Sequence, residues 1–146
     1  MSALNASAPS PWAKRLGYAG LIPFFALALA LWTVAPDQRG FFAMALLAYG
    51  ATITSFLGAI HWGLLMRDGA ESPALLLWGV VPSLVAWVAL LLGPANGLLV
   101  MAGLLVACLG VDRAVYPRYG VQAWLPMRLV LSCIATASCL AGAWRL

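Results

Sequence analysis

Four residues whose side chains can ionise lie within or at the ends of long apolar segments: His61, Asp112, Arg113 and Arg128. An ionisable side chain at membrane depth is costly, so it marks a functional site by default. Histidine changes its charge near physiological pH, which would let His61 carry a proton or bind a cofactor or substrate. A carboxylate and a guanidinium at the same depth would instead pair with each other. The chemistry of these residues therefore depends on the helices that carry them and on the depth at which each lies in the membrane.

The elements that position them are long apolar helices. Hydrophobic residues make up 64% of the 146 residues and charged residues only 8%, whereas soluble domains carry about 25% charged residues. Crossing the bilayer core takes about 20 predominantly apolar residues. Five segments reach this length: Leu16–Val34, Phe41–Met66, Ala74–Leu92, Asn96–Val115 and Leu125–Trp144. The sequence predicts an all-α membrane protein, a single bundle of five transmembrane helices over residues 16–146, after a flexible polar leader at residues 1–15.

The basic residues are distributed unevenly between the two expected sides of the membrane. One side has Lys14, Arg15, Arg67, Arg113, Arg118 and Arg128, and the other has Arg39 and Arg145. Cytoplasmic loops carry the excess of Lys and Arg, so we expect the N-terminus in the cytoplasm and the C-terminus outside. Because the basic residues are scattered over helix ends, they do not indicate nucleic-acid binding. The expected location is the cytoplasmic (inner) membrane of a bacterium.

The alternating direction of the helices brings the ionisable residues to one depth. His61 and Asp112 lie near the cytoplasmic ends of their helices, and Arg128 lies near the cytoplasmic start of the last one. The helix dipole disfavours a cation in a first turn and an anion in a last turn, so Arg128 and Asp112 each lack local compensation. We therefore predict an ion pair between them. Arg113 suits its helix end and would reach toward lipid phosphates.

Aromatic residues accompany this polar layer. Trp and Tyr gather toward both ends of the spans, as in the aromatic belts of membrane proteins. Trp62 differs because it adjoins His61 a little inside the helix end. Together with Tyr18 and Trp124, it completes the predicted polar site.

Small residues at helical spacing predict which faces pack together. One such face of the second span and one of the fifth each cover an arc of about 80°. Small side chains allow close approach of helices in lipid. Prolines within the first and third spans, Pro23 and Pro82, are expected to bend their helices. The predicted packing residues are Gly50, Thr54, Gly58, Ser132, Ala135, Cys139 and Gly142.

Signatures of catalysis and metal binding do not emerge from the sequence. It contains no nucleophile elbow, no paired carboxylates and no phosphate-binding glycine loop. No second ligand stands at a recognisable metal or haem spacing from His61. The three cysteines have neither metal-ligand nor redox spacing, and they are expected to be buried packing residues. We expect a protein without enzymatic activity, and the sequence assigns no cofactor.

Several motifs resemble those of one known family. They are the stretch Leu16-Gly-Tyr-Ala-Gly-Leu-Ile-Pro23, the block Gly58-Ala-Ile-His-Trp-Gly63, and Asp112-Arg113 followed by Trp124 and Arg128. The sequence is similar to an uncharacterised family of small bacterial inner-membrane proteins related to the animal mitochondrial transmembrane protein 69. The similarity covers the chain from about Leu16 to Trp144. It implies a multi-span membrane protein and brings no established chemistry.

Three functions are consistent with these observations. The first is a non-enzymatic binding or assembly module that contacts a larger inner-membrane complex, or a second copy, through the small-residue faces. The second is proton or small-ion translocation with His61 as carrier. The third is binding of a hydrophobic, tetrapyrrole-like or quinone-like ligand in a tryptophan-rich pocket. In each case the lipid bilayer is a partner.

Overall fold

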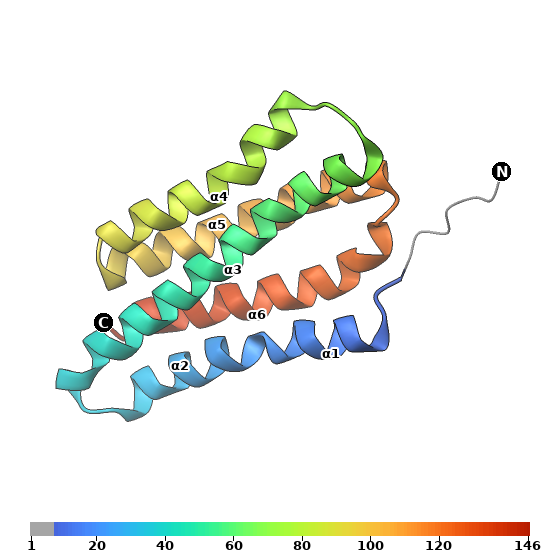
Figure 1. The fold of residues 1–146 in the computed structure, drawn as a ribbon. Helices are drawn as coiled ribbons and strands as arrows, with labels where there is room; N and C mark the ends of the chain where they lie inside the picture. Colours follow the sequence, from blue (N-terminus) through green and yellow to red (C-terminus); the bar gives the residue numbers. More distant parts are fainter. Residues whose placement is uncertain (1–7) are drawn as a thin grey trace.

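The structure is a computed structural model that describes residues 8–146, and its regular elements over that range are all helical (Figure 1). The longer helices are α1 (Pro11–Ala19), α2 (Leu21–Thr33), α3 (Arg39–Asp68), α4 (Pro73–Leu91), α5 (Pro94–Val115) and α6 (Leu125–Trp144). Short 3-10 helices connect them: η1 (Pro36–Gln38), η2 (Tyr116–Tyr119) and η3 (Gln122–Trp124). Residues 1–7 of the leader expected over residues 1–15 lie outside the described residues, and helix α1 begins at Pro11.

Within residues 8–146, five helical segments are long and apolar enough to cross a membrane, as predicted: Pro11–Thr33, Pro36–Asp68, Pro73–Leu91, Pro94–Tyr119 and Gln122–Trp144. The first begins before the predicted start at Leu16. Ser10 caps it, because the Ser10 hydroxyl accepts a hydrogen bond of 3.1 Å from the amide of Ala13, and Pro11 occupies the first helical position. A serine cap followed by proline is a favoured helix start, and it extends the helix into the polar leader.

Helix α3 is the central element of the bundle. It packs against α2, α4, α5 and α6, whereas α1 packs on α2 and α6. In Figure 1, α4 and α5 lie on one side of α3, and α1, α2 and α6 lie on the other. The described chain starts at one end of the bundle and finishes at the opposite end, as an odd number of crossings requires.

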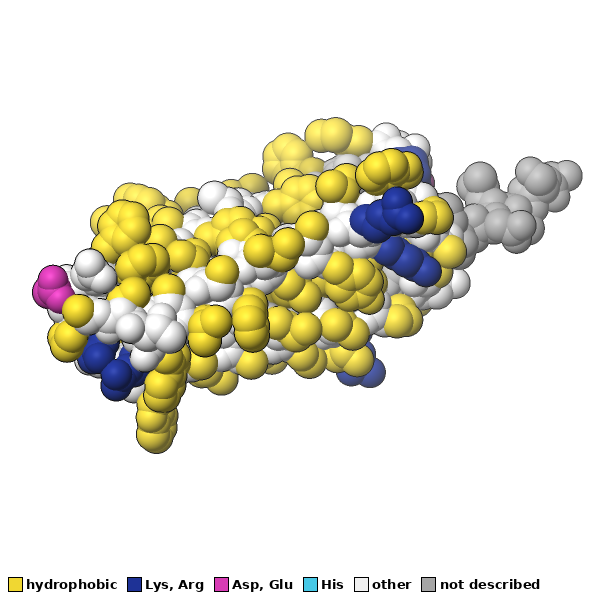
Figure 2. Space-filling model, turned by 90° about the horizontal axis from the view of Figure 1, so that it is seen from below, with side chains coloured by type: hydrophobic (Ala, Val, Ile, Leu, Met, Phe, Trp, Pro, Cys, Tyr) yellow, Lys and Arg dark blue, Asp and Glu magenta, His cyan; other side chains and the backbone are white. Residues whose placement is uncertain are grey.

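The flank of the bundle is hydrophobic (Figure 2). In this view yellow apolar side chains cover the length of the molecule, and Lys and Arg side chains gather toward its ends. Soluble monomers rarely expose apolar patches above a few hundred Å². Large exposed side chains on the outside of the bundle include Phe25, Phe41, Leu84, Leu91 and Leu129. This surface suits lipid, and the chain is a multi-pass membrane protein.

Small residues allow the helices to approach closely at the faces that the sequence indicated. Gly50, Thr54, Gly58, Ser132, Ala135, Cys139 and Gly142 are all buried. A Cβ atom added at Gly58 would lie 2.5 Å from the carbonyl oxygen of Gly79 in α4 and 3.2 Å from Pro82. One added at Gly50 would lie 2.9 Å from Met101 in α5. These faces are therefore filled by the bundle's own helices.

Pro23 lies near a break in the first span. It occupies the first turn of α2, and Gly20 separates α2 from α1. Proline donates no backbone hydrogen bond and its ring crowds the carbonyl one turn before it, which interrupts the helix there. The Tyr49 hydroxyl donates a 2.8 Å hydrogen bond to the carbonyl of Gly20. The broken span is thus tied to α3. Pro82, by contrast, stays within helix α4.

The cysteines differ in environment. Cys108 and Cys139 are buried, as expected, but Cys133 is exposed on α6, and all three are free thiols. The expectation that all three are buried packing residues is therefore wrong for Cys133. It lies beside Ser132, and adjacent residues on a helix face in different directions.

Candidate functional site

A buried carboxylate connects three helices. Asp112 of α5 forms a hydrogen bond with His61 of α3, and the distance between Oδ1 of Asp112 and Nε2 of His61 is 3.1 Å. Its other oxygen, Oδ2, accepts a 2.8 Å hydrogen bond from Nε of Arg128 in α6. The residue exposures are 1% for His61, 1% for Asp112 and 5% for Arg128. The structure thus contains the ion pair that the helix dipoles predicted, together with a histidine on the same carboxylate.

The contact fixes where a hydrogen of His61 lies. An ionised Asp112 only accepts hydrogen bonds, so in that state Nε2 of His61 is assigned the hydrogen and donates it to Oδ1. Nδ1 of the same ring is buried and has no hydrogen-bond partner. The ring of Tyr116 lies beside it, with ring centroids 6.2 Å apart. Asp112 is therefore satisfied from two sides, while the far edge of the imidazole keeps an unused polar atom.

Three more polar atoms on α6 are buried without a hydrogen-bond partner: Nη2 of Arg128 and the hydroxyls of Ser132 and Thr136. Nη2 of Arg128 lies 2.8 Å from Oδ2 of Asp112, which is an ion-pair distance, but its hydrogens do not point at that oxygen in hydrogen-bond geometry. Residues four apart lie on the same face of a helix, so the donors of Arg128 and Ser132 neighbour each other along α6.

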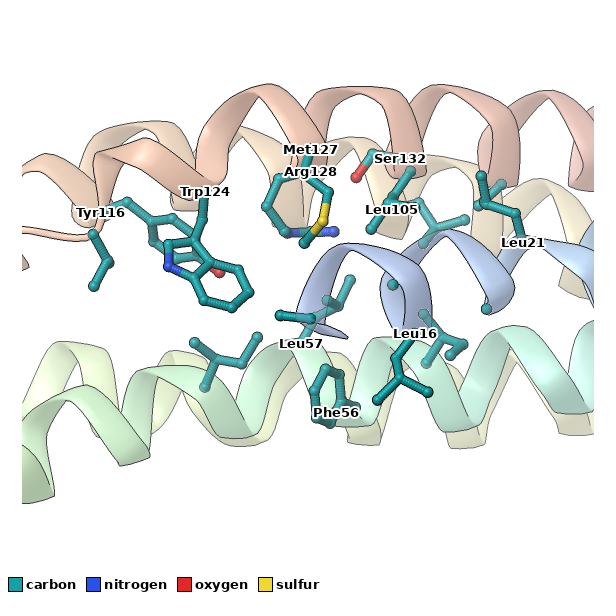
Figure 3. A pocket seen from close by; sticks show the side chains of 18 of the residues that line it. Leu16, Leu21, Phe56, Leu57, Leu105, Tyr116, Trp124, Met127, Arg128 and Ser132 are labelled. Atoms are coloured by element: carbon teal, nitrogen blue, oxygen red, sulfur yellow. The ribbon is translucent and has the colours of Figure 1, made fainter. Parts of the chain in front are cut away.

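A lateral pocket runs beside these groups. Its volume is about 620 Å³, and it lies between α1–α2, α3 and α6 (Figure 3). Phe56 and Leu57 of α3 face Leu16 of α1 across it. Most of the wall is apolar, and Arg128 and Ser132 contribute the polar part of the α6 side. Helix α1 packs mainly on α2 and α6, and the pocket lies between α1 and α3.

Trp124 and Tyr116 border the pocket next to Arg128. Trp124 belongs to the predicted site, and its indole is drawn close to the Tyr116 ring in Figure 3. The sequence placed Tyr116 only in the aromatic belt. The structure buries it, and it lines the pocket together with Arg128. Its position four residues after Asp112 was the available signal, because that spacing puts both residues on one face of the helix.

The other three predicted site residues lie elsewhere. Trp62 points to α4, where its indole N–H donates a 2.8 Å hydrogen bond to the carbonyl of Leu76. Adjacent helical residues do not face the same way, so Trp62 leaves the side on which His61 lies. Tyr18 is 44% exposed and is absent from the pocket wall. Arg113 is exposed at the end of α5.

Residues 8–146 contain no cluster of side chains that could bind a metal ion. No group of three or more His, Cys, Asp or Glu side chains within that range is arranged to hold a metal ion. His61 and Asp112 adjoin each other, but the third partner of the site is the cation Arg128. The chemistry of the site is therefore that of hydrogen bonding and charge compensation next to an apolar pocket.

The sequence matches a family model and is similar to an animal protein. Transmembrane protein 69 of Xenopus tropicalis is 39% identical over 140 residues, which cover 90% of this chain and 53% of that protein. The chain thus spans about half the length of that relative. No solved structure matches the chain. A family model described as "Protein of unknown function (DUF3429)" matches residues 9–144. The resemblance noted from the motifs is confirmed: the chain belongs to this uncharacterised family of membrane proteins, which is related to transmembrane protein 69.

Proposed function

We propose that this protein is a non-enzymatic binding module of the membrane, which takes a hydrophobic ligand from the bilayer into the lateral pocket. The observation that carries the proposal is an apolar pocket of about 620 Å³ with a buried, unused donor on its α6 side. Ligand pockets usually measure about 300–1,000 Å³ and combine apolar walls with a few polar groups. Asp112, which is itself bonded to His61, then holds the guanidinium of Arg128 in place.

Binding of a protein partner through the small-residue faces has less support. Gly58 is already covered by Gly79 and Pro82, and Gly142 by Leu46 and Leu31 of the same chain. A bulky residue at such a position would disturb the bundle itself. A larger membrane complex or a second copy remains a predicted partner, but it would contact the outer surface of the bundle and not these faces.

Proton or small-ion movement is the second candidate function. The free Nδ1 of the buried His61 favours it, because that atom can receive a proton. The apolar core counts against a continuous path, since Leu46, Leu47, Leu98 and Met101 are fully buried. Flux of protons into proteoliposomes measures this directly, and a flux that is the same in wild type and His61→Ala would remove the candidate.

The proposed setting is the bacterial inner membrane, with the N-terminus in the cytoplasm. The support is the distribution of basic residues, because Lys14, Arg15, Arg67 and Arg118 all belong to the side of the membrane that would be cytoplasmic. In this orientation the polar cluster lies toward the cytoplasmic side. Labelling of single cysteines introduced at the two ends of the bundle, in intact cells, would test the orientation.

The pocket proposal is tested by filling the pocket. Ile60 lines it and is partly buried, so Ile60→Trp should occupy the space of a ligand. Ala13→Trp fills it from the opposite wall on α1. Leu84→Trp is the matched control, because Leu84 is exposed on α4 and does not line the pocket. Each variant is purified in a gentle detergent, and mass spectrometry identifies the hydrophobic molecules that remain bound.

We expect wild type and Leu84→Trp to retain the same molecule, and both filling variants to lose it. Far-UV circular dichroism must show equal helix content in all four proteins, so that loss of the ligand is not loss of the fold. Equal retention by all four would mean that the molecule binds to the outer surface, and the pocket proposal would then be abandoned.

A further inference from the structure

We infer that the ligand of the lateral pocket is a neutral lipid with a planar, carbonyl-bearing ring, the chemistry of a membrane quinone, whose carbonyl oxygen accepts hydrogen bonds from Arg128 and Ser132. The inference rests on the proposed function and adds the chemical class of the ligand. It follows from three properties of the pocket: the donors on its α6 side, the charge balance behind them and the aromatic side chains around them.

The donors define the polar end of the ligand. Nη2 of Arg128 and the hydroxyl of Ser132 are one helical turn apart on α6, and neither has a hydrogen-bond partner. Both side chains line the pocket, although these two atoms lie just beneath its surface. Because these donors are neighbours on one face of α6, a single acceptor in the pocket would lie near both. Guanidinium only donates, so the matching group on the ligand is an oxygen acceptor.

The charge balance indicates that this acceptor is neutral. Arg128 is already paired with Asp112 at 2.8 Å, and His61 adds a hydrogen bond without requiring a charge. The buried cluster therefore sums to zero when Asp112 and Arg128 are ionised. A carboxylate or phosphate headgroup would add a second negative charge without a second cation, and burying an uncompensated charge is unfavourable. A carbonyl oxygen uses the free donors and leaves the balance unchanged.

Aromatic side chains favour a ring over a branched glycerol ester. Phe24, Phe56, Tyr116 and Trp124 all contribute to the pocket wall. Flat rings pack against such side chains in stacked or edge-to-face geometry, which adds to the gain from apolar burial. Aliphatic residues such as Leu16 and Leu64 form the rest of the wall, where an apolar tail would lie. A ring with a carbonyl and a hydrocarbon tail satisfies all three regions.

Four probes separate this ligand from its alternatives: an alkylated 1,4-naphthoquinone, the alkylnaphthalene of the same shape, a fatty acid with the same chain, and a short-chain diacylglycerol. Native mass spectrometry of the full chain in detergent gives the bound fraction of each probe as its concentration is raised. The proteins are wild type, Ser132→Ala and Ile60→Trp. Ser132→Ala removes one donor and leaves the Asp112–Arg128 pair in place, so it should preserve the fold.

We expect the naphthoquinone to bind wild type more tightly than the other three probes. Loss of one hydrogen bond should weaken it about 3- to 10-fold in Ser132→Ala, while alkylnaphthalene binding should be the same in both proteins. Ile60→Trp should bind none of the probes. These results together would support the ligand class.

Other outcomes overturn the inference in distinguishable ways. Equal binding of quinone and hydrocarbon, unaffected by Ser132→Ala but abolished by Ile60→Trp, leaves the pocket as a binding site and removes the carbonyl requirement. Tighter binding of the fatty acid or the diacylglycerol replaces the quinone by that class. Binding that Ile60→Trp does not change, or no binding of any probe to wild type, removes both the inference and the probe-based support for the proposed function.

Discussion

Replacing Asp112 with asparagine removes the negative charge next to Arg128 but keeps an oxygen for Nε2 of His61. The two charges of the ion pair lie 2.8 Å apart in a nearly fully buried site. At an effective dielectric constant of about 20, unit charges at that distance attract each other by about 6 kcal/mol. Desolvation offsets much of this, and breaking one side of a buried pair typically costs about 3–5 kcal/mol. We expect Asp112→Asn to lower the free energy of unfolding by about this amount.

The double variant decides whether the loss comes from the pair. Arg128→Gln alone should destabilise about as much as Asp112→Asn, because it leaves the carboxylate uncompensated. Combining both substitutions removes both charges, so the double variant should be no less stable than the worse single variant. Unfolding is followed by far-UV circular dichroism during an SDS titration in mixed micelles.

A neighbouring arginine is the control for this cycle. Arg113 is adjacent to Asp112 but exposed, so Arg113→Gln should change the free energy of unfolding by less than about 1 kcal/mol. If the two single losses simply add in the double variant, within about 0.5 kcal/mol, the residues are independent and the reasoning is refuted.

Two further predictions concern packing. Gly58→Ala should destabilise the bundle, since its Cβ would meet the Gly79 carbonyl at 2.5 Å, whereas Gly63→Ala, which meets nothing within 4 Å, should be neutral or slightly stabilising. The same SDS titration compares them, and equal effects would contradict the close packing. Trp62→Phe removes the hydrogen bond to the Leu76 carbonyl, so it should lower the free energy of unfolding by about 0.5–1.5 kcal/mol. Because Trp62 does not face the pocket, mass spectrometry should find the same retained ligand as in wild type, and a changed ligand would argue against this placement.

Helix number and the polar pairing could be predicted from local rules. Apolar length alone defines the five spans, and it needs no knowledge of packing. The pairing of Asp112 with Arg128 followed from their unfavourable positions in two helix dipoles and from their equal depth. Small-residue spacing likewise indicated that Gly58 and Ser132 face other helices, and both are buried.

The pocket could not be predicted in this way, because it depends on where α1 lies relative to α3. That placement follows from the packing of α1 on α6 and from the break at Gly20, neither of which leaves a periodic signal in the sequence. Trp62 shows a second limit. Sequence proximity to His61 suggested a shared site, but at 100° per residue its neighbour turns toward α4.

The shared carboxylate of Asp112 also bears on how the chain enters the bilayer. Helices α5 and α6 each carry one charge of the pair, and a lone Asp or Arg in the middle of a span opposes insertion by about 2.5–3.5 kcal/mol, less toward the ends. Only the short η2 and η3 segments separate the two helices, so their charges can meet before either helix is surrounded by lipid. We expect α5 and α6 to leave the translocon as one hairpin, already paired, and His61 to complete the cluster when this hairpin docks on α3.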